Sequence, residues 1–165
     1  RAQTGVTSSK AIDYQAGMET MQSFLYTALA GCNITSQTAG SLANLMTSSL
    51  EKTVLDDELI ARVRLLVDGL PFSDEFMAMD QIMETDFGAD FLRQKATRKY
   101  CRQAWEPNCS DWNSSDVWEK KGCQESTEKA HAIVQKILAE APESILEEGQ
   151  QQEMEQYIAS LGEEG

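Results

Sequence analysis

Two groups of polar side chains near the start of the chain have the residue types and spacing to bind a small molecule. The first is the run Thr7-Ser8-Ser9-Lys10, which precedes a helix that Asp13 can cap. Free backbone N–H groups and the helix dipole at such a position attract anions, and Lys10 adds a positive charge. The hydroxyls and Asp13 could instead only cap the helix, so both interpretations stay open. The second group follows a short apolar stretch and consists of Thr35, Ser36, Gln37 and Thr38.

Other ionisable residues suggest less chemistry. Asp56, Asp57 and Glu58 could work as paired carboxylates or bind a hard cation, but adjacent residues on a helix do not face each other. We therefore predict a solvated helix face for this acidic run. His131 is the only histidine, which excludes a metal site built from several histidines, and its place in a surface-type helix predicts a structural or solvent-facing role. The sequence predicts no metal site.

The cysteines indicate the redox compartment. Cys32, Cys101, Cys109 and Cys123 lack the close pairwise spacing of a zinc site. Three glycosylation sequons, which begin at Asn33, Asn108 and Asn113, would suit a secreted protein with disulfides. However, a chain of 165 residues does not need disulfides for stability, and Cys32 lies in a small apolar stretch where a buried thiol behaves as a hydrophobe. We predict free thiols and keep a secreted, disulfide-linked domain as the alternative.

The overall charge excludes several classes of protein. The chain has a net charge of −13 and no apolar run near the ~20 residues of a membrane span. Its acidity disfavours nucleic acids and anionic membranes as partners. The exception is a basic run at 93–102, whereas no Lys or Arg follows Lys136. We expect the basic run and the acidic tail to pair with each other or to stay solvated.

Hydrophobic periodicity predicts a mostly helical chain. Residues 1–10 are expected to form a loop, and a helix should follow Asp13 and end at Gly31, with Gly17 marking close packing. A short buried strand is expected at 32–35 and a loop from there to Gly40. Further helices are expected at 49–68, after Ser73, at 91–105, at 116–121, at 124–141 and near the end of the chain, with a polar loop at 106–115 and a capping box formed by Ser144 and Glu147.

The apolar residues of each helix predict its buried face. These residues are Met18, Met21, Phe24, Leu25, Ala28 and Leu29 in the first helix; Leu55, Leu59, Val63, Leu66, Val67 and Leu70 in the second; Met79, Ile82 and Met83 in the third; and Ala130, Ile133, Val134, Ile137 and Leu138 in the helix at 124–141.

The order helix, strand, helix over 13–68 is typical of a βα barrel or a doubly wound sheet whose front is missing. One or two strands do not make a stable sheet, and the chain begins at Arg1 without an initiator Met, so we expect part of a larger protein. The expected fold class is α/β, with final βα units at 1–70 and a helical region at 71–165. In a barrel, the carboxyl ends of the strands face the active site, which would place both polar groups at the catalytic rim.

A longer motif supports this expectation. The segment Thr7-Ser8-Ser9-Lys10-Ala11-Ile12-Asp13-Tyr14-Gln15-Ala16-Gly17-Met18-Glu19 resembles the trimethylamine methyltransferase family, which has Ser-Asp-Ser-Lys, then Asp, then Gln-Ala-Gly and Glu at this spacing. The run Ala28-Leu29-Ala30-Gly31-Cys32-Asn33 is similar to the family's Ala-Leu-Ala-Gly-Ala-Asn. Thr7 and Ser8 depart from the family's Ser-Asp pair, and Cys32 replaces its usual Ala.

The resemblance implies a (β/α)8 TIM barrel of which this chain is the C-terminal part, itself mostly α-helical with one or two short strands. Members move a methyl group from a tertiary or quaternary amine to the Co(I) centre of a separate corrinoid protein, as in methanogenesis and methylamine metabolism. The implied partners are therefore a cognate corrinoid protein and a small amine, with no cofactor bound directly by this chain. We also expect a cytoplasmic homo-oligomer. The residues that would face substrate or cofactor at the rim are Thr7, Ser8, Ser9, Lys10, Asp13, Gln15, Glu19, Thr35, Ser36 and Gln37.

Two questions stay open from the sequence. Members that use trimethylamine carry pyrrolysine shortly before the Ser-Lys motif, and this sequence has none. Either the protein acts on a betaine-like amine without pyrrolysine, or that residue precedes Arg1. The alternative function is a helical interaction module without chemistry of its own.

Overall fold

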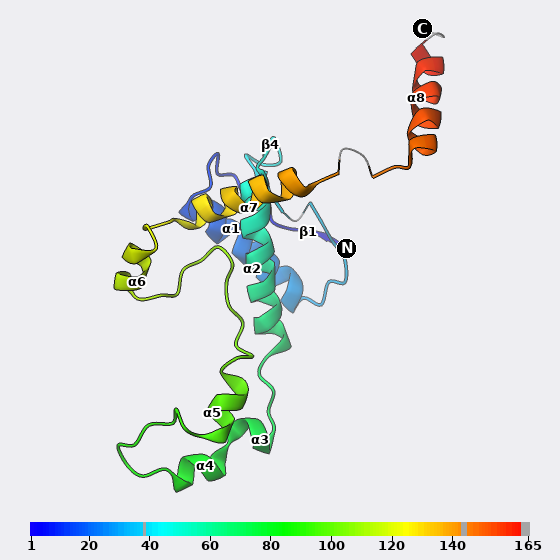
Figure 1. The fold of residues 1–165 in the computed structure, drawn as a ribbon. Coiled ribbons are helices and arrows are strands. Elements are labelled where there is room, and N and C mark those ends of the chain that lie inside the picture. Colours follow the sequence, from blue (N-terminus) through cyan, green and yellow to red (C-terminus); the bar gives the residue numbers. More distant parts are fainter. Residues whose placement is uncertain (38, 143–144, 163–165) are drawn as a thin grey trace. The chain divides into compact units, whose positions relative to one another are not determined.

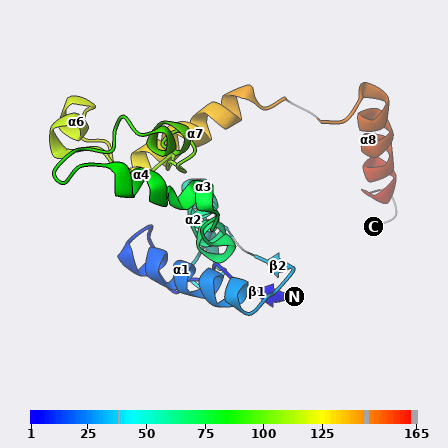
Figure 2. The ribbon, with the colours of Figure 1, turned by 90° about the horizontal axis from the view of Figure 1, so that it is seen from below.

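The first two strands form a short parallel pair. The structure is a computed structural model that describes residues 1–37, 39–142 and 145–162. In it, β1 (Ala2–Gln3) pairs with β2 (Thr35–Ser36), and Ala2 lies opposite Thr35 (Figures 1 and 2). The helix α1 (Tyr14–Leu29) connects them, so the segment is a small βαβ unit. The expected loop at 1–10 thus contains a strand. The expected buried strand at 32–35 begins only at Thr35 and is partly exposed, because its position is set by the hydrogen-bond register with β1.

The cap signals of α1 work as predicted, and its predicted buried face is confirmed in part, since Phe24 is buried and Met21, Leu25 and Ala28 are partly buried. Asp13 caps the helix by accepting a 2.9 Å hydrogen bond from the N–H of Ala16, and Gly31 leaves the helix at φ +70°. The buried residues are Ala16, Thr20 and Phe24. The predicted residues Met18 and Leu29 are exposed, since the row that contacts α2 includes the polar Thr20. Gly17 has no neighbour within 4 Å of where a Cβ would lie, so it does not mark close packing.

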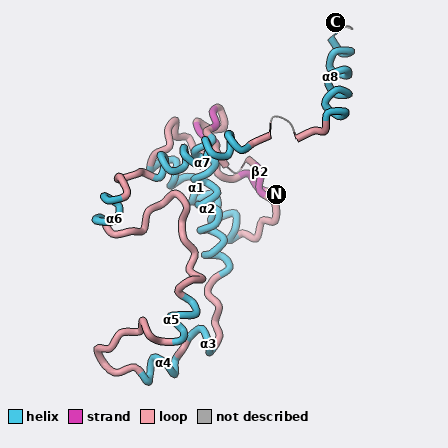
Figure 3. The backbone as a smooth tube through the Cα atoms, viewed as in Figure 1, coloured by secondary structure: helices cyan, strands magenta, loops and turns pink. Residues whose placement is uncertain are grey.

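A β-hairpin lies after the expected loop that ends at Gly40, in a segment for which no element was predicted. Strands β3 (Ser41–Leu42) and β4 (Thr47–Ser48) pair antiparallel and are drawn in magenta with the other strands in Figure 3. We call residues Ala43–Met46 the hairpin turn. Three of its residues, Ala43, Asn44 and Leu45, have left-handed φ values of 49°, 53° and 72°. The turn contains no Asn-Gly or Asp-Gly pair, which is the usual sequence signal of a hairpin, so a hairpin was not predicted here.

The long helix α2 (Leu50–Asp68) begins and ends where predicted. Ser49 accepts a hydrogen bond from the N–H of Lys52, and Gly69 ends the helix at φ +72°. The predicted apolar face is wrong apart from Val63 and the partly buried residues Leu55 and Leu59, whereas Leu66, Val67 and Leu70 are exposed. Three of the four buried residues are charged: Lys52, Asp56 and Glu58.

Three short helices follow α2. They are α3 (Asp74–Met77), capped by Ser73 as predicted, α4 (Met79–Glu84) and α5 (Lys95–Tyr100). The rings of Phe76 and Tyr100 meet edge to face at 5.1 Å, and Lys99 pairs with Glu75, so α5 is tied to α3. The basic helix expected at 91–105 is thus limited to α5. The apolar residues of α4 predicted to be buried are exposed: Met79, Ile82 and Met83.

The remaining helices are α6 (Ser115–Lys120), α7 (Ser126–Glu140) and α8 (Glu148–Gly162). Ala130 and Val134 of α7 are buried as predicted, whereas Ile137 and Leu138 are exposed.

The chain divides into two compact units, Arg1–Val134 and Gln135–Gly165. The boundary expected near residue 70 stays a prediction, and Ser144 of the expected capping box lies outside the described residues. Among the described helices, none has the length and apolarity to cross a membrane.

Candidate functional site

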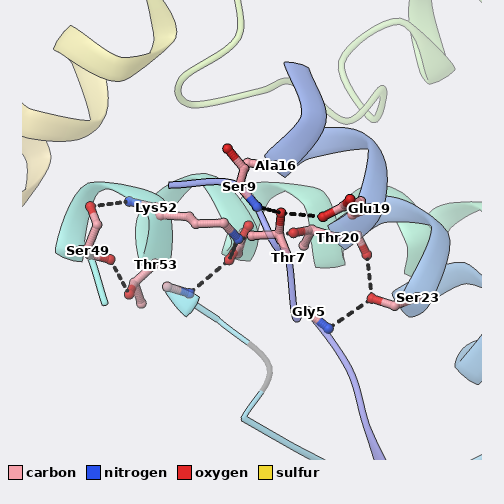
Figure 4. Close-up of polar contacts among 12 residues, drawn as sticks. Gly5, Thr7, Ser9, Ala16, Glu19, Thr20, Ser23, Ser49, Lys52 and Thr53 are labelled. Carbon is pink, nitrogen blue, oxygen red and sulfur yellow. Dashed lines mark hydrogen bonds and ion pairs between the residues drawn. The ribbon is translucent and has the colours of Figure 1, made fainter. Parts of the chain in front are cut away.

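Four of the predicted rim residues form one hydrogen-bond network around Glu19, of which Figure 4 shows Thr7 and Glu19. We call residues Thr7–Lys10 the motif loop. The Thr7 hydroxyl donates to Glu19 Oε2 at 2.6 Å, and the backbone N–H of Ser8 donates to the same oxygen at 2.8 Å. Gln15 Nε2 donates to Glu19 Oε1 at 2.9 Å, and the Ser8 hydroxyl also lies within hydrogen-bond distance of the carboxylate. The structure therefore brings together four of the residues that the motif singled out.

Glu19 is held in its ionised form by this network. Hydrogen bonds from the Thr7 hydroxyl, the Gln15 amide and the Ser8 backbone lower the pKa of Glu19 from 4.5 to about 2. Because both carboxylate oxygens already accept hydrogen bonds, Glu19 is suited to fixing the shape of the motif loop rather than to exchanging a proton near neutral pH.

The rest of the motif loop serves mainly to start α1. Ser9 donates its backbone N–H to the Thr7 hydroxyl oxygen at 3.0 Å and its own hydroxyl to the carbonyl of Ala11 at 3.1 Å. The hydrogen bond from the N–H of Ala16, together with the Ser9 hydroxyl, lowers the pKa of Asp13. Both residues therefore act in helix capping, as one of the two interpretations held. Lys10 is exposed, and within residues 1–37, 39–142 and 145–162 it forms no ion pair.

The second predicted group lies at the same edge of the strand pair, apart from Thr38, which lies outside the described residues. Thr35 and Ser36 form β2, and the Ser36 carbonyl accepts a 3.4 Å hydrogen bond from the N–H of Thr4, the residue after β1. The Gln37 side-chain oxygen accepts from the side-chain amide of Gln3. Because β1 and β2 are parallel, both groups follow carboxyl ends of strands at one edge. In the described part of the chain, however, no direct hydrogen bond joins Thr35, Ser36 or Gln37 to the Glu19 network.

A buried ion pair on α2 was missed by the sequence analysis. Lys52 Nζ lies 2.6 Å from Asp56 Oδ2 and donates to the Thr20 hydroxyl of α1 at 3.1 Å. The N–H of Gly40 donates to the same Asp56 oxygen at 2.8 Å. Burial raises the pKa of Asp56, and the Lys52 ammonium opposes that rise. The predicted solvated face is therefore wrong for Asp56, and the Lys52–Asp56 spacing of four residues was the available signal.

The hairpin turn contacts the motif loop directly. The N–H of Ala43 donates to the carbonyl of Ser9 at 2.7 Å, and the N–H of Asn44 donates to the carbonyl of Thr7 at 2.9 Å. At the other end of the hairpin, the N–H of Ser49 donates to the Gly40 carbonyl at 2.9 Å. The motif loop is thus held by Glu19, through two hydroxyls and the N–H of Ser8, and by the hairpin turn, through the carbonyls of Thr7 and Ser9. Only the tertiary structure reveals this second support.

Glu58 ties α2 to the loop at 105–113 and is also not solvated. It accepts a 2.6 Å hydrogen bond from the N–H of Cys109 and a 3.0 Å ion-pair contact from Arg62. Burial alone would raise the pKa of Glu58, but donors from Ser110, Cys109 and Arg62 bring it down to about 2. The Arg62 guanidinium lies over the rings of Trp105 and Trp112 at 4.9 and 5.3 Å.

The other candidates are the single histidine and the four cysteines. His131 is exposed, and its Nδ1 lies 2.9 Å from Glu51 on the surface. All four cysteines are free thiols, although the deeply buried one is Cys109 and not Cys32. Across the described residues, no group of three or more His, Cys, Asp or Glu side chains could hold a metal ion. The candidate site is an oxygen-rich surface, tied together by hydrogen bonds, beside the parallel strand pair.

Comparisons with known proteins match this whole region. The family model for trimethylamine methyltransferase matches residues 1–165. The chain is 35% identical over 165 residues to a glycine betaine methyltransferase of Desulfitobacterium hafniense, and the aligned region covers 99% of the chain and 34% of that protein. It is 33% identical over 132 residues to the trimethylamine methyltransferase MttB of Methanosarcina barkeri, and this aligned region covers 80% of the chain and 26% of that protein. The chain thus spans about a third or less of the length of these relatives. It belongs to the trimethylamine methyltransferase family.

Proposed function

We propose that this chain is the C-terminal part of a (β/α)8-barrel enzyme that transfers a methyl group from trimethylamine or a betaine-like quaternary amine to the Co(I) of a cognate corrinoid protein. The match of the family model to residues 1–165 is the observation that carries this proposal. The named relatives act on trimethylamine and on glycine betaine, which supports an N-methylated amine as the substrate class. The four free thiols favour a reducing, cytoplasmic compartment.

The barrel part of the proposal is supported by the strand pair. Strands β1 and β2 have two residues each and are parallel, and a pair this small is not stable alone in water. Parallel strands joined by a helix normally belong to a larger sheet that is covered on both faces. We therefore propose that β1 and β2 are neighbouring strands of a barrel completed by the rest of the enzyme.

In this mechanism, the chain binds and orients the substrate. The reaction would break a methyl C–N bond and pass the methyl group to the Co(I) of the partner protein. The electron pair of the broken C–N bond would stay on nitrogen as the lone pair of the demethylated amine, and trimethylamine would react in its N-protonated form so that it leaves as a neutral amine. The nucleophile belongs to the corrinoid protein, so the chain needs neither a nucleophile nor a general base. This division of labour agrees with a rim in which Glu19 is saturated by donors and Asp13 caps a helix. The network keeps the rim in one shape, which lowers the entropic cost of orienting the amine.

The test uses the full-length enzyme and its corrinoid protein in the Co(I) state. Methyl transfer from trimethylamine or glycine betaine should appear as the change from the Co(I) to the methyl-cobalt absorption spectrum. The variant Glu19→Ala should slow transfer, whereas Glu153→Ala on α8 serves as a matched exposed control. A folded full-length protein that demethylates neither amine would favour the alternative, a helical interaction module without chemistry.

A further inference from the structure

The hairpin turn, Ala43–Met46, has no role in the motif that relates this chain to its family, yet it is built against that motif. The N–H groups of Ala43 and Asn44 donate to the carbonyls of Ser9 and Thr7 at 2.7 and 2.9 Å. The turn is closed by its own hydrogen bond, from the N–H of Met46 to the carbonyl of Ala43 at 3.2 Å. The turn and the motif loop therefore form one backbone-linked surface.

The backbone of the turn is strained in a way that needs this support. Ala43, Asn44 and Leu45 are three successive non-glycine residues in the left-handed region. Asn tolerates this region, but Ala and Leu adopt it at a cost. Such conformations persist where the surrounding structure holds them, and they cluster at ligand-binding sites. The two hydrogen bonds to the motif loop and the anchored base at Gly40 supply that support.

The turn also reaches the second predicted group of rim residues. A cavity of about 220 Å³ is lined by Leu45 from the turn and by Gln37, which follows β2. Met46, the last residue of the turn, is 84% exposed, and Leu45 is 40% exposed. The hairpin turn thus contacts the motif loop and also shares a cavity with Gln37. Its exposed side chains are apolar, in contrast to the hydroxyls and amides of the rim.

We propose that the hairpin turn is the specificity-determining wall of the amine site, with Leu45 and Met46 contacting the N-methyl groups of the substrate. This inference rests on the proposed function. The methyl groups of a tertiary or quaternary amine are apolar and carry no hydrogen-bond donor, so a polar rim alone does not distinguish them from other small molecules. A flexible, polarisable Met beside a Leu provides an apolar surface that adapts to different numbers of methyl groups. The backbone of Ala43 and Asn44 holds this wall at a fixed place relative to Thr7 and Ser9.

The side-chain test compares two substrates in the full-length enzyme with its corrinoid protein. Met46→Ala and Leu45→Ala should change the ratio of kcat/KM for trimethylamine to that for glycine betaine by about tenfold, because removing a methyl-sized contact has effects of this order. The change should fall mainly on KM. Met154→Ala on α8, an exposed methionine far along the sequence, is the matched control and should leave the ratio unchanged. Unchanged ratios in both turn variants would overturn the inference.

The backbone test uses the left-handed position of Asn44. Asn44→Gly keeps the left-handed conformation available, whereas Asn44→Val disfavours it. The valine variant should raise KM and speed hydrogen exchange at the amides of residues 43 and 44, and the glycine variant should do neither. If both variants exchange and bind like the wild type, the turn has no positioning role. If the wild type neither binds nor demethylates either amine, the proposed function itself has failed, which is a different result from an active enzyme that is insensitive to the turn.

Discussion

Glu19 shows how a titratable residue in a binding motif can be structural. Its two oxygens accept hydrogen bonds from three residues of the motif, Thr7, Ser8 and Gln15. A carboxylate in this state is a fixed acceptor that orders a loop, and its negative charge is shared among several donors. The spacing of the motif, in which Glu19 follows Gln15 by one helical turn, therefore encodes a loop conformation as well as any contact with substrate.

This network predicts a pH dependence. The pKa of Glu19 is lowered from 4.5 to about 2 in the folded chain, so its ionised form stabilises the fold above pH 4.5 and this contribution is lost as the pH falls towards 2. In urea titrations at several pH values between 4.5 and 2, the free energy of unfolding of Glu19→Gln should therefore fall less steeply with decreasing pH than that of the wild type.

Other carboxylates titrate in the same window, so the informative quantity is the difference between variant and wild type. Glu51, Glu58 and Asp111 also have pKa values near 2. Glu153→Gln on α8 provides the control. Equal acid slopes for wild type and Glu19→Gln would show that the network does not favour the charged form.

The thiols should react in the order of their exposure. Cys101 and Cys123 are exposed, whereas Cys109 is buried and burial raises the pKa of its thiol. In the native chain, a thiol reagent should label Cys101 and Cys123 quickly and Cys109 slowly, as peptide mass spectrometry would measure. In denaturant all four should react. Fewer than four reactive thiols would instead support the disulfide-linked alternative.

At the scale of elements, α2 organises the region through two carboxylates that point to different partners. Asp56 holds Gly40 at the base of the hairpin, and Glu58 holds the backbone of Cys109 and Ser110 in the loop at 105–113. The closeness of Gly40 is strict: a Cβ there would lie 2.2 Å from the Thr53 hydroxyl and 2.9 Å from the Ser49 carbonyl. The hairpin therefore requires glycine at this position.

The variant pair Glu58→Ala and Asp57→Ala separates a buried anchor from an exposed neighbour. Glu58→Ala leaves the N–H of Cys109 without its acceptor and should lower the free energy of unfolding by on the order of 3 kcal/mol. Asp57 is exposed, so its replacement should change stability by about 0.5 kcal/mol or less. Chemical denaturation measures both. Equal small effects would mean that the loop at 105–113 is held by other contacts.

The local parts of this structure could be predicted from sequence, and the tertiary parts could not. The helix starts at Asp13, Ser49 and Ser73 and the ends at Gly31 and Gly69 were predicted, because caps depend on a few adjacent residues. Clustering of Thr7, Ser8, Gln15 and Glu19 was anticipated by the motif. The roles of Asp56 and Glu58 were missed, since their partners Gly40 and Cys109 lie 16 and 51 residues away.

At the scale of the whole molecule, the exposed apolar residues fit a chain that packs against further polypeptide. Large hydrophobic side chains on α1 and α2 are exposed, among them Met18, Leu29, Leu65 and Leu66. Contiguous exposed apolar surface normally marks an interface. We propose that these exposed helix faces pack against the rest of the complete enzyme.

This proposal predicts a difference in dye binding. The chain alone should bind an apolar fluorescent dye such as ANS under native conditions, and the same residues within the full-length enzyme should bind much less. Fluorescence titration of both proteins at equal concentration measures the difference, and far-UV circular dichroism confirms that the chain is helical. Equal dye binding would show that the exposed faces of α1 and α2 are not covered by the rest of the enzyme.

The pair of indole rings around Arg62 has a practical consequence. Trp105 and Trp112 meet edge to face with their centroids 5.5 Å apart and an interplanar angle of 67°, and a cation lies beside both. Two indoles in such contact give a near-UV circular dichroism signal and a fluorescence yield that depend on their separation. The chain thus carries an intrinsic optical reporter, which would reveal, without any label, when the segment held by Glu58 detaches from α2.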